Sequence, residues 1–234
     1  MNKQNSVYTI VYASVMVIIV AAVLAFTALK LKPIQNKNIE IDKKSQILRS
    51  VNIASTAADA EALYAKYITE AYIVNTEGDI VSKDAAEAFN TDMAVQSKIA
   101  PDKRILPVYV CTLEDGSHKY IFPMYGSGLW GPIWGYVAVD SNGNTIYGAT
   151  FSHQGETPGL GAEIEKPEFS NQYHDKSMFI DGTFKSVAVE KKGQKPIDGA
   201  DQVDAISGGT ITSKGVQKMM YDCIAPYQNF LKKL

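Results

Sequence analysis

Asp204-Ala205-Ile206-Ser207-Gly208-Gly209-Thr210-Ile211-Thr212-Ser213 is the stretch that decides how the rest of this sequence is interpreted. It closes an irregular, glycine-bearing segment and opens a run with helical spacing. The paired glycines let a backbone approach a ligand closely. Hydroxyl residues at a helix start leave backbone N–H groups pointing outward, which favours an anion such as a phosphate. The same residues also suit an ordinary capped helix after a loop, and on physical grounds alone both interpretations stay open.

Two earlier stretches share this richness in glycine. One is Gln154-Gly155-Glu156-Thr157-Pro158-Gly159-Leu160-Gly161. The other is Tyr125-Gly126-Ser127-Gly128-Leu129-Trp130-Gly131-Pro132-Ile133-Trp134-Gly135-Tyr136. We call them the Glu156 loop and the Gly/Trp turn, and the stretch 204–213 the Thr210 motif.

Together these stretches resemble the motifs of the periplasmic FMN-binding domain family, over nearly the whole chain. That family attaches FMN at the last Thr of Asp-x-x-Ser/Thr-Gly-Ala-Thr, which Asp204, Ser207, Gly208 and Thr210 match, while Gly209 replaces the Ala. The Glu156 loop is similar to the family's Glu-Thr-Pro-Gly-Leu-Gly loop, which contacts the flavin. The Gly/Trp turn resembles the branch formed by the C subunits of sodium-translocating NADH:quinone oxidoreductases more than the branch formed by the G subunits of Rnf complexes.

The resemblance implies covalent FMN, joined by a phosphoester to Thr210, with Thr212 as the nearest rival. The residues that it implies at the cofactor are Ser207, Gly208, Gly209, Thr212, Glu156, Thr157, Gly159, Leu160, Gly161 and Trp130. N–H groups around 211–213 are expected to seat the phosphate, with Lys214 either adding a positive charge or pointing into solvent. Glu156 either touches the flavin or caps a turn, and Trp130 and Trp134 either cover the ring or pack in the core. No catalytic residue and no metal site are expected.

The function implied is that of a membrane-anchored flavoprotein subunit, which relays electrons within a sodium-translocating NADH:quinone oxidoreductase. The expected partners are other membrane subunits of that complex, a flavin transferase and the lipid bilayer. Two alternatives stay open: the G subunit of the Rnf ferredoxin:NAD oxidoreductase complex, and an anchored scaffold that has lost the flavin. No Gly-rich dinucleotide fingerprint follows a strand, so NADH chemistry is expected elsewhere in the complex.

Composition is that of a globular protein, with 23 basic and 25 acidic residues in 234 and a net charge of −2. No basic face is evident, which argues against nucleic acid as a partner. Cys111 and Cys223 lack metal-ligand spacing. They are expected to be two buried thiols, although a disulfide is the alternative. The three histidines are scattered and suggest no metal centre.

The segment from Val7 to Leu29 is apolar, uncharged and long enough to span a bilayer as one helix. A cleavable signal peptide is the alternative, with a weak cleavage site at 25–28. Lys30, Lys32 and Lys37 follow the segment, whereas only Lys3 precedes it, so the positive-inside rule places the domain in the cytoplasm. The family resemblance implies the opposite: a single-pass protein of the bacterial inner membrane with its domain in the periplasm.

The remaining pattern predicts an α+β domain, with a mostly antiparallel sheet and flanking helices behind the transmembrane helix. We divide the chain into an anchor (1–32), a linker and helical lead-in (33–104) and an FMN-binding core (105–234). A linker is expected at 32–38. Helices are expected at 39–51, 57–69, 84–89 (capped by Ser82 or Asp84), 166–173 and 212–227. Strands are expected at 71–75, 80–81, 105–113, 119–124, 133–139, 145–153 and 184–190.

Overall fold

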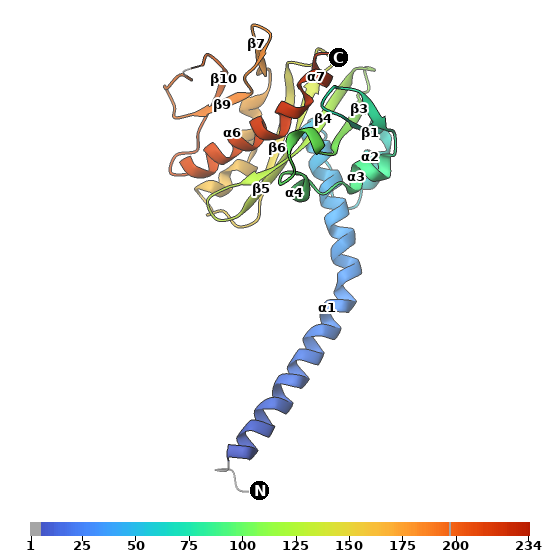
Figure 1. Ribbon diagram of the computed structural model, residues 1–234, viewed down its shortest axis with the longest axis vertical. Helices are drawn as coiled ribbons and strands as arrows, with labels where there is room; N and C mark the ends of the chain where they lie inside the picture. The colour runs from blue at the N-terminus through green and yellow to red at the C-terminus, as the bar shows by residue number, and fades with distance from the viewer. Residues whose placement is uncertain (1–5, 197) are drawn as a thin grey trace. The chain divides into compact units, whose positions relative to one another are not determined.

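A computed structural model describes residues 6–196 and 198–234 of the chain. The chain divides into two compact units, and the boundary between them in the sequence falls between Lys43 and Lys44. Figure 1 shows the elements of both units, coloured along the chain. Lys3, one of the residues that bear on the predicted orientation, lies outside the described part.

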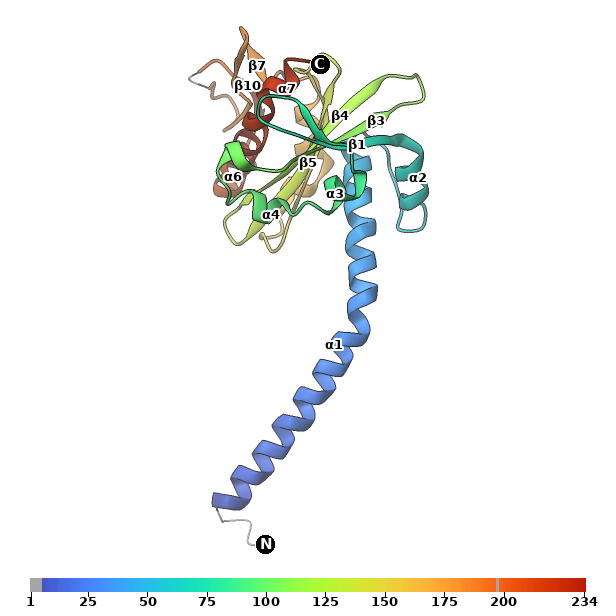
Figure 2. The same ribbon diagram turned by 45° about the vertical axis from the view of Figure 1, so that its right-hand side comes forward.

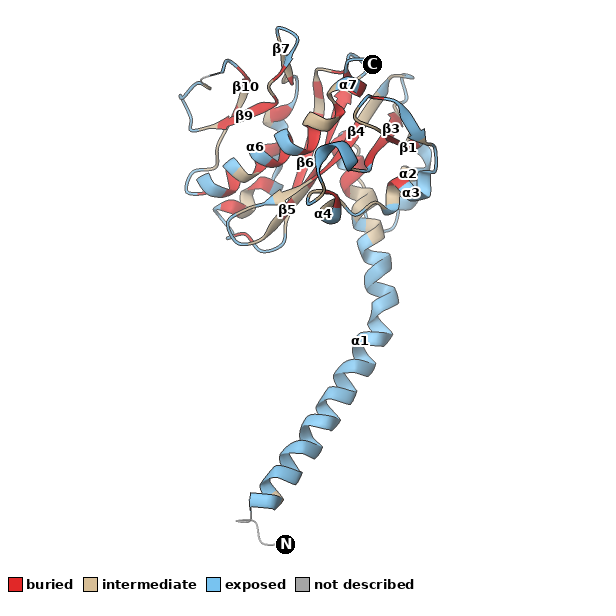
Figure 3. Cartoon of the chain, in the orientation of Figure 1, coloured by how far each residue is buried: buried red, intermediate tan, exposed pale blue. Residues whose placement is uncertain are grey.

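Helix α1 (Ser6–Ser50) is 45 residues long and continues through Pro33. The linker predicted at 32–38 is therefore wrong. A proline removes one helical hydrogen bond and usually kinks a helix, but the flanking lysines, leucines and glutamines favour helix and the turns resume beyond it. The apolar part of α1 is exposed (Figure 3) and has a mean hydropathy of 2.6 in its most apolar 18-residue stretch. Among the described residues it is the one helix long and apolar enough to cross a membrane, which fits the predicted anchor.

The second unit is built on a six-stranded antiparallel sheet of order β2-β1-β3-β4-β5-β6. Its strands are β1 (Ile68–Val74), β2 (Ile80–Ser82), β3 (Leu106–Thr112), β4 (His118–Ser127), β5 (Pro132–Asp140) and β6 (Ile146–His153). This confirms the predicted α+β fold with a mostly antiparallel sheet. Strands β1 and β2, from the segment 33–104, extend one edge of the same sheet.

Each face of the sheet buries its own core, because alternate residues of a strand point to opposite faces. Along β3, Val108 and Val110 join one core, while Tyr109 and Cys111 join the other. Helix α6 (Thr210–Ile224) covers the first face. The end of α1, α2 (Ala60–Tyr67) and α3 (Ala85–Asn90) cover the second, as Figure 2 shows from the side.

Several predicted boundaries shift in the structure. The predicted helix 57–69 ends at Tyr67, since the β-branched Ile68 and Thr69 enter β1. Of the two proposed caps of α3, Asp84 is the one that caps, accepting hydrogen bonds from the N–H groups of Ala86 at 2.8 Å and Glu87 at 3.2 Å. The segment 91–104, for which no element was predicted, holds α4 (Met93–Gln96) and a 3-10 turn (Pro101–Lys103).

The predicted strand 184–190 is two strands, β8 (Thr183–Phe184) and β9 (Val187–Glu190). Ser186 separates them with a φ of +60°, which a regular strand does not allow. β8 pairs with β7 (Phe179–Ile180), and β9 pairs in parallel with β10 (Asp201–Asp204), which was not predicted.

The predicted helix 166–173 is α5 (Pro167–Ser170) followed by a 3-10 turn (Asn171–Tyr173). The predicted helix 212–227 begins two residues earlier and is α6, a 3-10 turn (Ala225–Tyr227) that contains Pro226, and α7 (Gln228–Leu231). Its predicted buried stripe of Val216, Met219, Met220 and Cys223 is confirmed.

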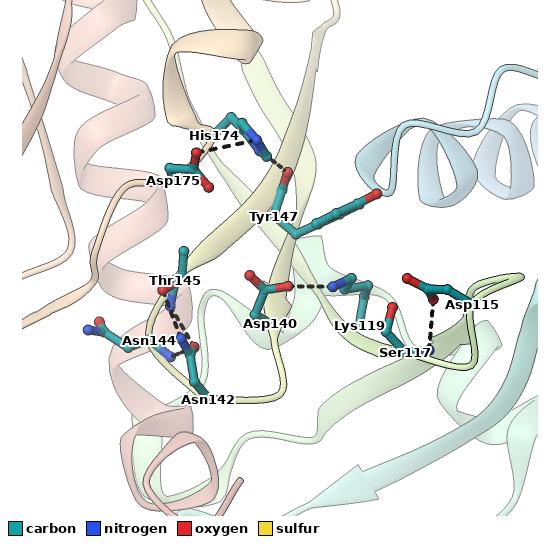
Figure 4. A network of polar contacts seen from close by, with 10 residues as sticks. All are labelled: Asp115, Ser117, Lys119, Asp140, Asn142, Asn144, Thr145, Tyr147, His174 and Asp175. Atoms are coloured by element: carbon teal, nitrogen blue, oxygen red, sulfur yellow. Dashed lines mark hydrogen bonds and ion pairs between the residues drawn. The ribbon is translucent and has the colours of Figure 1, made fainter.

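Side chains fix the turns at one end of the sheet (Figure 4). Lys119 Nζ on β4 forms an ion pair of 2.6 Å with Asp140 Oδ1 on β5 and lies over the ring of Tyr147 on β6. In the β5–β6 turn, Asn142 Oδ1 accepts the N–H groups of Asn144 and Thr145, each at 2.9 Å. These contacts hold the register of the three strands that carry the Gly/Trp turn and the Glu156 loop at the opposite end.

Candidate functional site

The Thr210 motif forms the connection between β10 and α6. Asp204 ends β10, and Gly208 turns the chain with a φ of +74°, a left-handed conformation that glycine adopts readily. Helix α6 then begins at Thr210, with Gly209 as its N-cap residue. The unpredicted strand β10 therefore fixes the start of the motif, and the helix fixes its end.

The first turn of α6 presents free backbone donors. The N–H of Ser213 donates to the carbonyl of Gly209 at 2.9 Å and so belongs to the helix ladder. The N–H groups of Thr210, Ile211 and Thr212 have no acceptor among the described residues, and no side chain there caps this end. Free donors at the positive end of a helix form a seat for an anion. The donors open to an anion are those of 210–212, because Ser213 is already paired, and their role in seating a phosphate stays a prediction.

The two threonines of this turn differ in exposure and in partners. Thr210 is exposed, and its hydroxyl has no partner among the described residues. Thr212 is 1% exposed, and its Oγ1 donates to Glu156 Oε2 at 2.5 Å. Of the two, only Thr210 offers a hydroxyl that another molecule can reach.

Glu156 lies in the interior although it carries a charge, with 4% of its surface exposed. Its Oε1 accepts the backbone N–H of Trp130 at 2.8 Å, and its own N–H donates to His153 Nδ1 at 3.0 Å. Burial by itself raises the pKa of this carboxyl, but hydrogen bonds from Thr212 and from the N–H groups of Trp130 and Gly131 outweigh it, so the pKa lies below its ordinary value of 4.5. The group is thus an anion at neutral pH.

Two glycines leave room for this carboxylate. A Cβ on Gly128 would lie 2.5 Å from Glu156 Oε1. A Cβ on Gly161 would collide with Glu156 Oε2 and lie 2.6 Å from Thr212 Oγ1. Gly161 therefore allows a close approach to Glu156 and Thr212, while its predicted contact with the flavin stays a prediction.

The Glu156 loop also packs against the Thr210 motif. A Cβ on Gly208 would lie 2.6 Å from Leu160 Cδ2, and one on Gly209 would lie 3.2 Å from the carbonyl carbon of Leu160. Thr157 shapes the loop, since its carbonyl accepts the N–H groups of Leu160 at 3.0 Å and of residue 162 at 3.1 Å. Gly159 has a φ of +76° and donates its N–H to Glu163 Oε1 at 3.0 Å.

Exposed apolar side chains occur on all three stretches. Trp130 is 70% exposed, Ile211 60% and Leu160 41%. Ser207 is exposed as well. Large apolar side chains on a surface often mark a binding site.

Two of the candidate residues serve other roles. Lys214 Nζ forms an ion pair of 2.8 Å with Glu190 Oε1 on β9, so it is neither free in solvent nor held at the anion seat. Trp134 donates from Nε1 to Gln46 Oε1 at 3.1 Å, near the end of α1. Trp134 is thus half-buried and held by Gln46, while Trp130 is the exposed one of the pair.

A groove of about 660 Å³ adjoins the Gly/Trp turn and the exposed flank of α6, and Trp130 and Leu129 line it. β4 and α6 approach closely here: a Cβ on Gly126 would lie 2.7 Å from Met219 Cβ, and one on Gly215 would lie 2.5 Å from the carbonyl oxygen of Ser127. This groove was not predicted from the sequence. A glycine inside a helix, as at position 215, was the available signal, since it is unfavourable there without a packing reason. Among the described residues, no group of His, Cys, Asp or Glu is placed to hold a metal ion.

The model of the FMN-binding domain family matches residues 128–225, a range that contains the Glu156 loop, the Thr210 motif and most of the Gly/Trp turn. The fold and this site therefore define an FMN-binding domain. The C subunit of the Na(+)-translocating NADH-quinone reductase of Vibrio vulnificus is 34% identical over 213 residues, 86% of this chain and 83% of that protein. The same subunit from Haemophilus ducreyi is 32% identical over 228 residues, covering 92% of this chain and 88% of that protein.

Solved structures agree with this relationship. The crystal structure of the C subunit from Parabacteroides distasonis is 50% identical, with a TM-score of 0.79, over 86% of this chain and 96% of that one. That of Shewanella oneidensis NqrC is 27% identical, with a TM-score of 0.68, over 84% and 98%. The chain belongs to the family of C subunits of the Na(+)-translocating NADH-quinone reductase, whose members are parts of an enzyme complex. The predicted family is thus confirmed, in preference to the G subunits of Rnf complexes.

Proposed function

We propose that this chain carries FMN as a phosphoester on Thr210 Oγ1 and passes electrons between partner subunits of a Na(+)-translocating NADH-quinone reductase. The proposal rests on the difference in exposure between Thr210 and Thr212, which lie in the same helical turn. Thr210 is exposed beside three free N–H donors, whereas the hydroxyl of Thr212 is buried on Glu156.

The residues of the site fit the parts of FMN. The N–H groups of 210–212 and the positive end of α6 suit the single negative charge of a phosphate diester. The exposed side chains of Leu160 and Trp130 offer apolar contact for a flat aromatic ring. When bound, FMN supplies the redox chemistry, and the protein holds, orients and tunes it.

Attachment requires a flavin transferase with an activated flavin nucleotide as donor. The oxygen of the Thr210 hydroxyl attacks the phosphorus of the flavin phosphate. An O–P bond forms, the bond from phosphorus to the nucleotide leaving group breaks, and the hydroxyl proton goes to a base of the transferase. The chain gains the mass of FMN less one water. Exposure of Thr210 on a turn fixed by β10 and α6 suits a hydroxyl that another enzyme must reach.

The chain is an intermediate electron carrier in this proposal, because its sequence has a site for a flavin and no motif for binding NADH. It offers a seat for one flavin but no dinucleotide fingerprint. A tether to the membrane raises the local concentration of partner subunits without requiring tight docking. The full-length chain should therefore accept electrons from a strong chemical reductant and oxidise NADH negligibly. Rapid oxidation of NADH by the chain alone would contradict the relay role.

Helix α1 fits a single-pass anchor in the bacterial inner membrane, with the lipid bilayer as its surroundings. We assign the second unit to the periplasmic side, on the grounds of the family's attachment of flavin there. Lys30, Lys32 and Lys37 argue for the opposite side, but long domains cross the membrane largely regardless of nearby charge.

The test of the cofactor is flavin fluorescence of the chain in a denaturing gel, where only covalent flavin stays bound. Thr210→Ala should abolish the fluorescence. Thr212→Ser is the matched control, because it keeps a hydroxyl for Glu156 and should keep the fluorescence. Fluorescence that remains in Thr210→Ala would refute the attachment site. A wild-type chain without flavin fluorescence would favour the alternative of an anchored scaffold that has lost the flavin.

A further inference from the structure

One carboxylate joins the three stretches that form the site. Glu156 belongs to the Glu156 loop, its Oε1 accepts the N–H of Trp130 on the Gly/Trp turn at 2.8 Å, and its Oε2 accepts the hydroxyl of Thr212 on α6 at 2.5 Å. These segments lie far apart in the sequence, and each carries at least one residue expected at the flavin. Glu156 is thus one of the contacts that set the position of Thr210 relative to Trp130 and Leu160.

The carboxylate is enclosed and therefore holds its partners in a defined place. Gly128 and Gly161 pack against its two oxygens so closely that neither position admits a Cβ. Among the described residues no lysine or arginine pairs with it. Its charge is balanced by N–H and O–H donors, and it lies near the positive end of α6.

We propose that Glu156 is a positioning residue: it fixes the first turn of α6 against the Gly/Trp turn and the Glu156 loop, and places a fixed negative charge behind the flavin seat. It acts through Thr212 and Trp130 and does not touch the flavin. This inference rests on the proposed attachment of FMN at Thr210. Of the two roles considered for Glu156, capping a turn agrees with the hydrogen bond from the Trp130 N–H in the Gly/Trp turn, while contact with the flavin is not part of this proposal.

A fixed negative charge near a flavin opposes the addition of electrons, and the effect is strong where water is excluded. Loss of the charge should therefore raise the midpoint potential of the flavin. Loss of the hydrogen bonds should loosen the turn that carries it. The two effects can be separated, because glutamine keeps the shape of the side chain. Its amide oxygen can accept from Trp130 and its amide nitrogen can donate to Thr212 Oγ1.

The experiment compares full-length chains with Glu156→Gln, Glu156→Ala and Thr212→Val, and Glu168→Gln as control. Glu168 is an exposed glutamate on α5, so its replacement removes one charge outside the site. The readouts are the midpoint potential of the flavin, its fluorescence anisotropy and the melting temperature. Hydrogen exchange of the Ser213 amide, which donates to the carbonyl of Gly209 at 2.9 Å, is measured in the same variants made in Thr210→Ala chains, which carry no flavin at this position.

Glu156→Gln should raise the midpoint potential while anisotropy stays near that of the wild type. Thr212→Val and Glu156→Ala should lower the anisotropy and speed the exchange of the Ser213 amide at least severalfold. The control Glu168→Gln should leave the midpoint potential, the anisotropy and the hydrogen exchange unchanged. If Glu156→Ala fails to fold, Glu156→Gln and Thr212→Val still test the positioning role of Glu156. A lower melting temperature with unchanged potential, anisotropy and exchange would overturn the positioning role. If the wild-type chain carries no covalent FMN, the proposed function fails, yet the exchange measurement still tests the link between Glu156 and α6.

Discussion

Thr212 Oγ1 donates a hydrogen bond to Glu156 Oε2 at 2.5 Å, although the two residues are 56 positions apart in the sequence. Thr212 belongs to the turn that bears Thr210, and Glu156 belongs to a loop that follows β6. This contact explains why two threonines so close in sequence differ in role. One is buried as a structural partner, and the other is left at the surface.

Acid should weaken the fold partly through Glu156. Its pKa is lower in the folded chain than the ordinary 4.5, so its contribution to stability is complete above that value and is lost as the pH falls below it. The free energy of unfolding of the wild type should therefore fall relative to that of Glu156→Gln between about pH 6 and about pH 3. Urea denaturation of both chains across this range measures the difference. A difference that does not change with pH would contradict the assigned anionic state.

Two turn glycines should differ in how they tolerate alanine. Gly116 has a φ of +82° and open space around it, while Gly143 has a φ of +67° and a Cβ there would collide with the carbonyl oxygen of Leu231 on α7. Gly116→Ala should cost about 1 kcal/mol from backbone strain alone. Gly143→Ala should cost clearly more, because the β5–β6 turn must move away from α7. Equal losses in thermal denaturation would show that the turn and α7 do not pack as described.

Both cysteines should resist thiol reagents in the folded chain. Cys111 and Cys223 are free and lie in separate cores, and burial raises the pKa of each thiol to about 11. The reactive thiolate is therefore scarce at neutral pH. A maleimide should label neither thiol in the native chain and both after denaturation without reductant. Labelling of only one or none after denaturation without reductant would point to an oxidised pair.

Protease accessibility tests the proposed orientation. Protease added to intact spheroplasts should digest the second unit, since we assign it to the periplasmic side. Digestion only after lysis would mean that the lysines at 30, 32 and 37 set the orientation. An inner-membrane protein with a cytoplasmic domain provides the control for intact spheroplasts.

The sheet could largely be predicted from the sequence, because alternation of apolar residues and turn glycines are local signals. Strands β3 to β6 have nearly the predicted bounds for this reason. The short parallel pair of β9 and β10 was missed since Asp201–Asp204 is a polar segment whose strand depends on pairing with Val187–Glu190. Pro33 suggested a linker, but the strong helix formers around it continue α1.

Parts of the site could be predicted only as motifs. Gly208 and Leu160, both predicted at the flavin, are in contact in the structure, while their contact with a flavin stays a prediction. The partnership of Thr212 with Glu156 and the pairing of Lys214 with Glu190 could not be predicted. Each joins residues that are distant in the chain, and only the packing of α6 on the sheet brings them together.

The intact mass of the full-length chain purified from its native membrane tests whether FMN is attached covalently to this protein. We expect a gain of one FMN less one water, and tandem mass spectrometry of the peptide that spans 204–214 should place that gain on Thr210. An unmodified mass, or a gain on Thr212, would refute covalent attachment at Thr210.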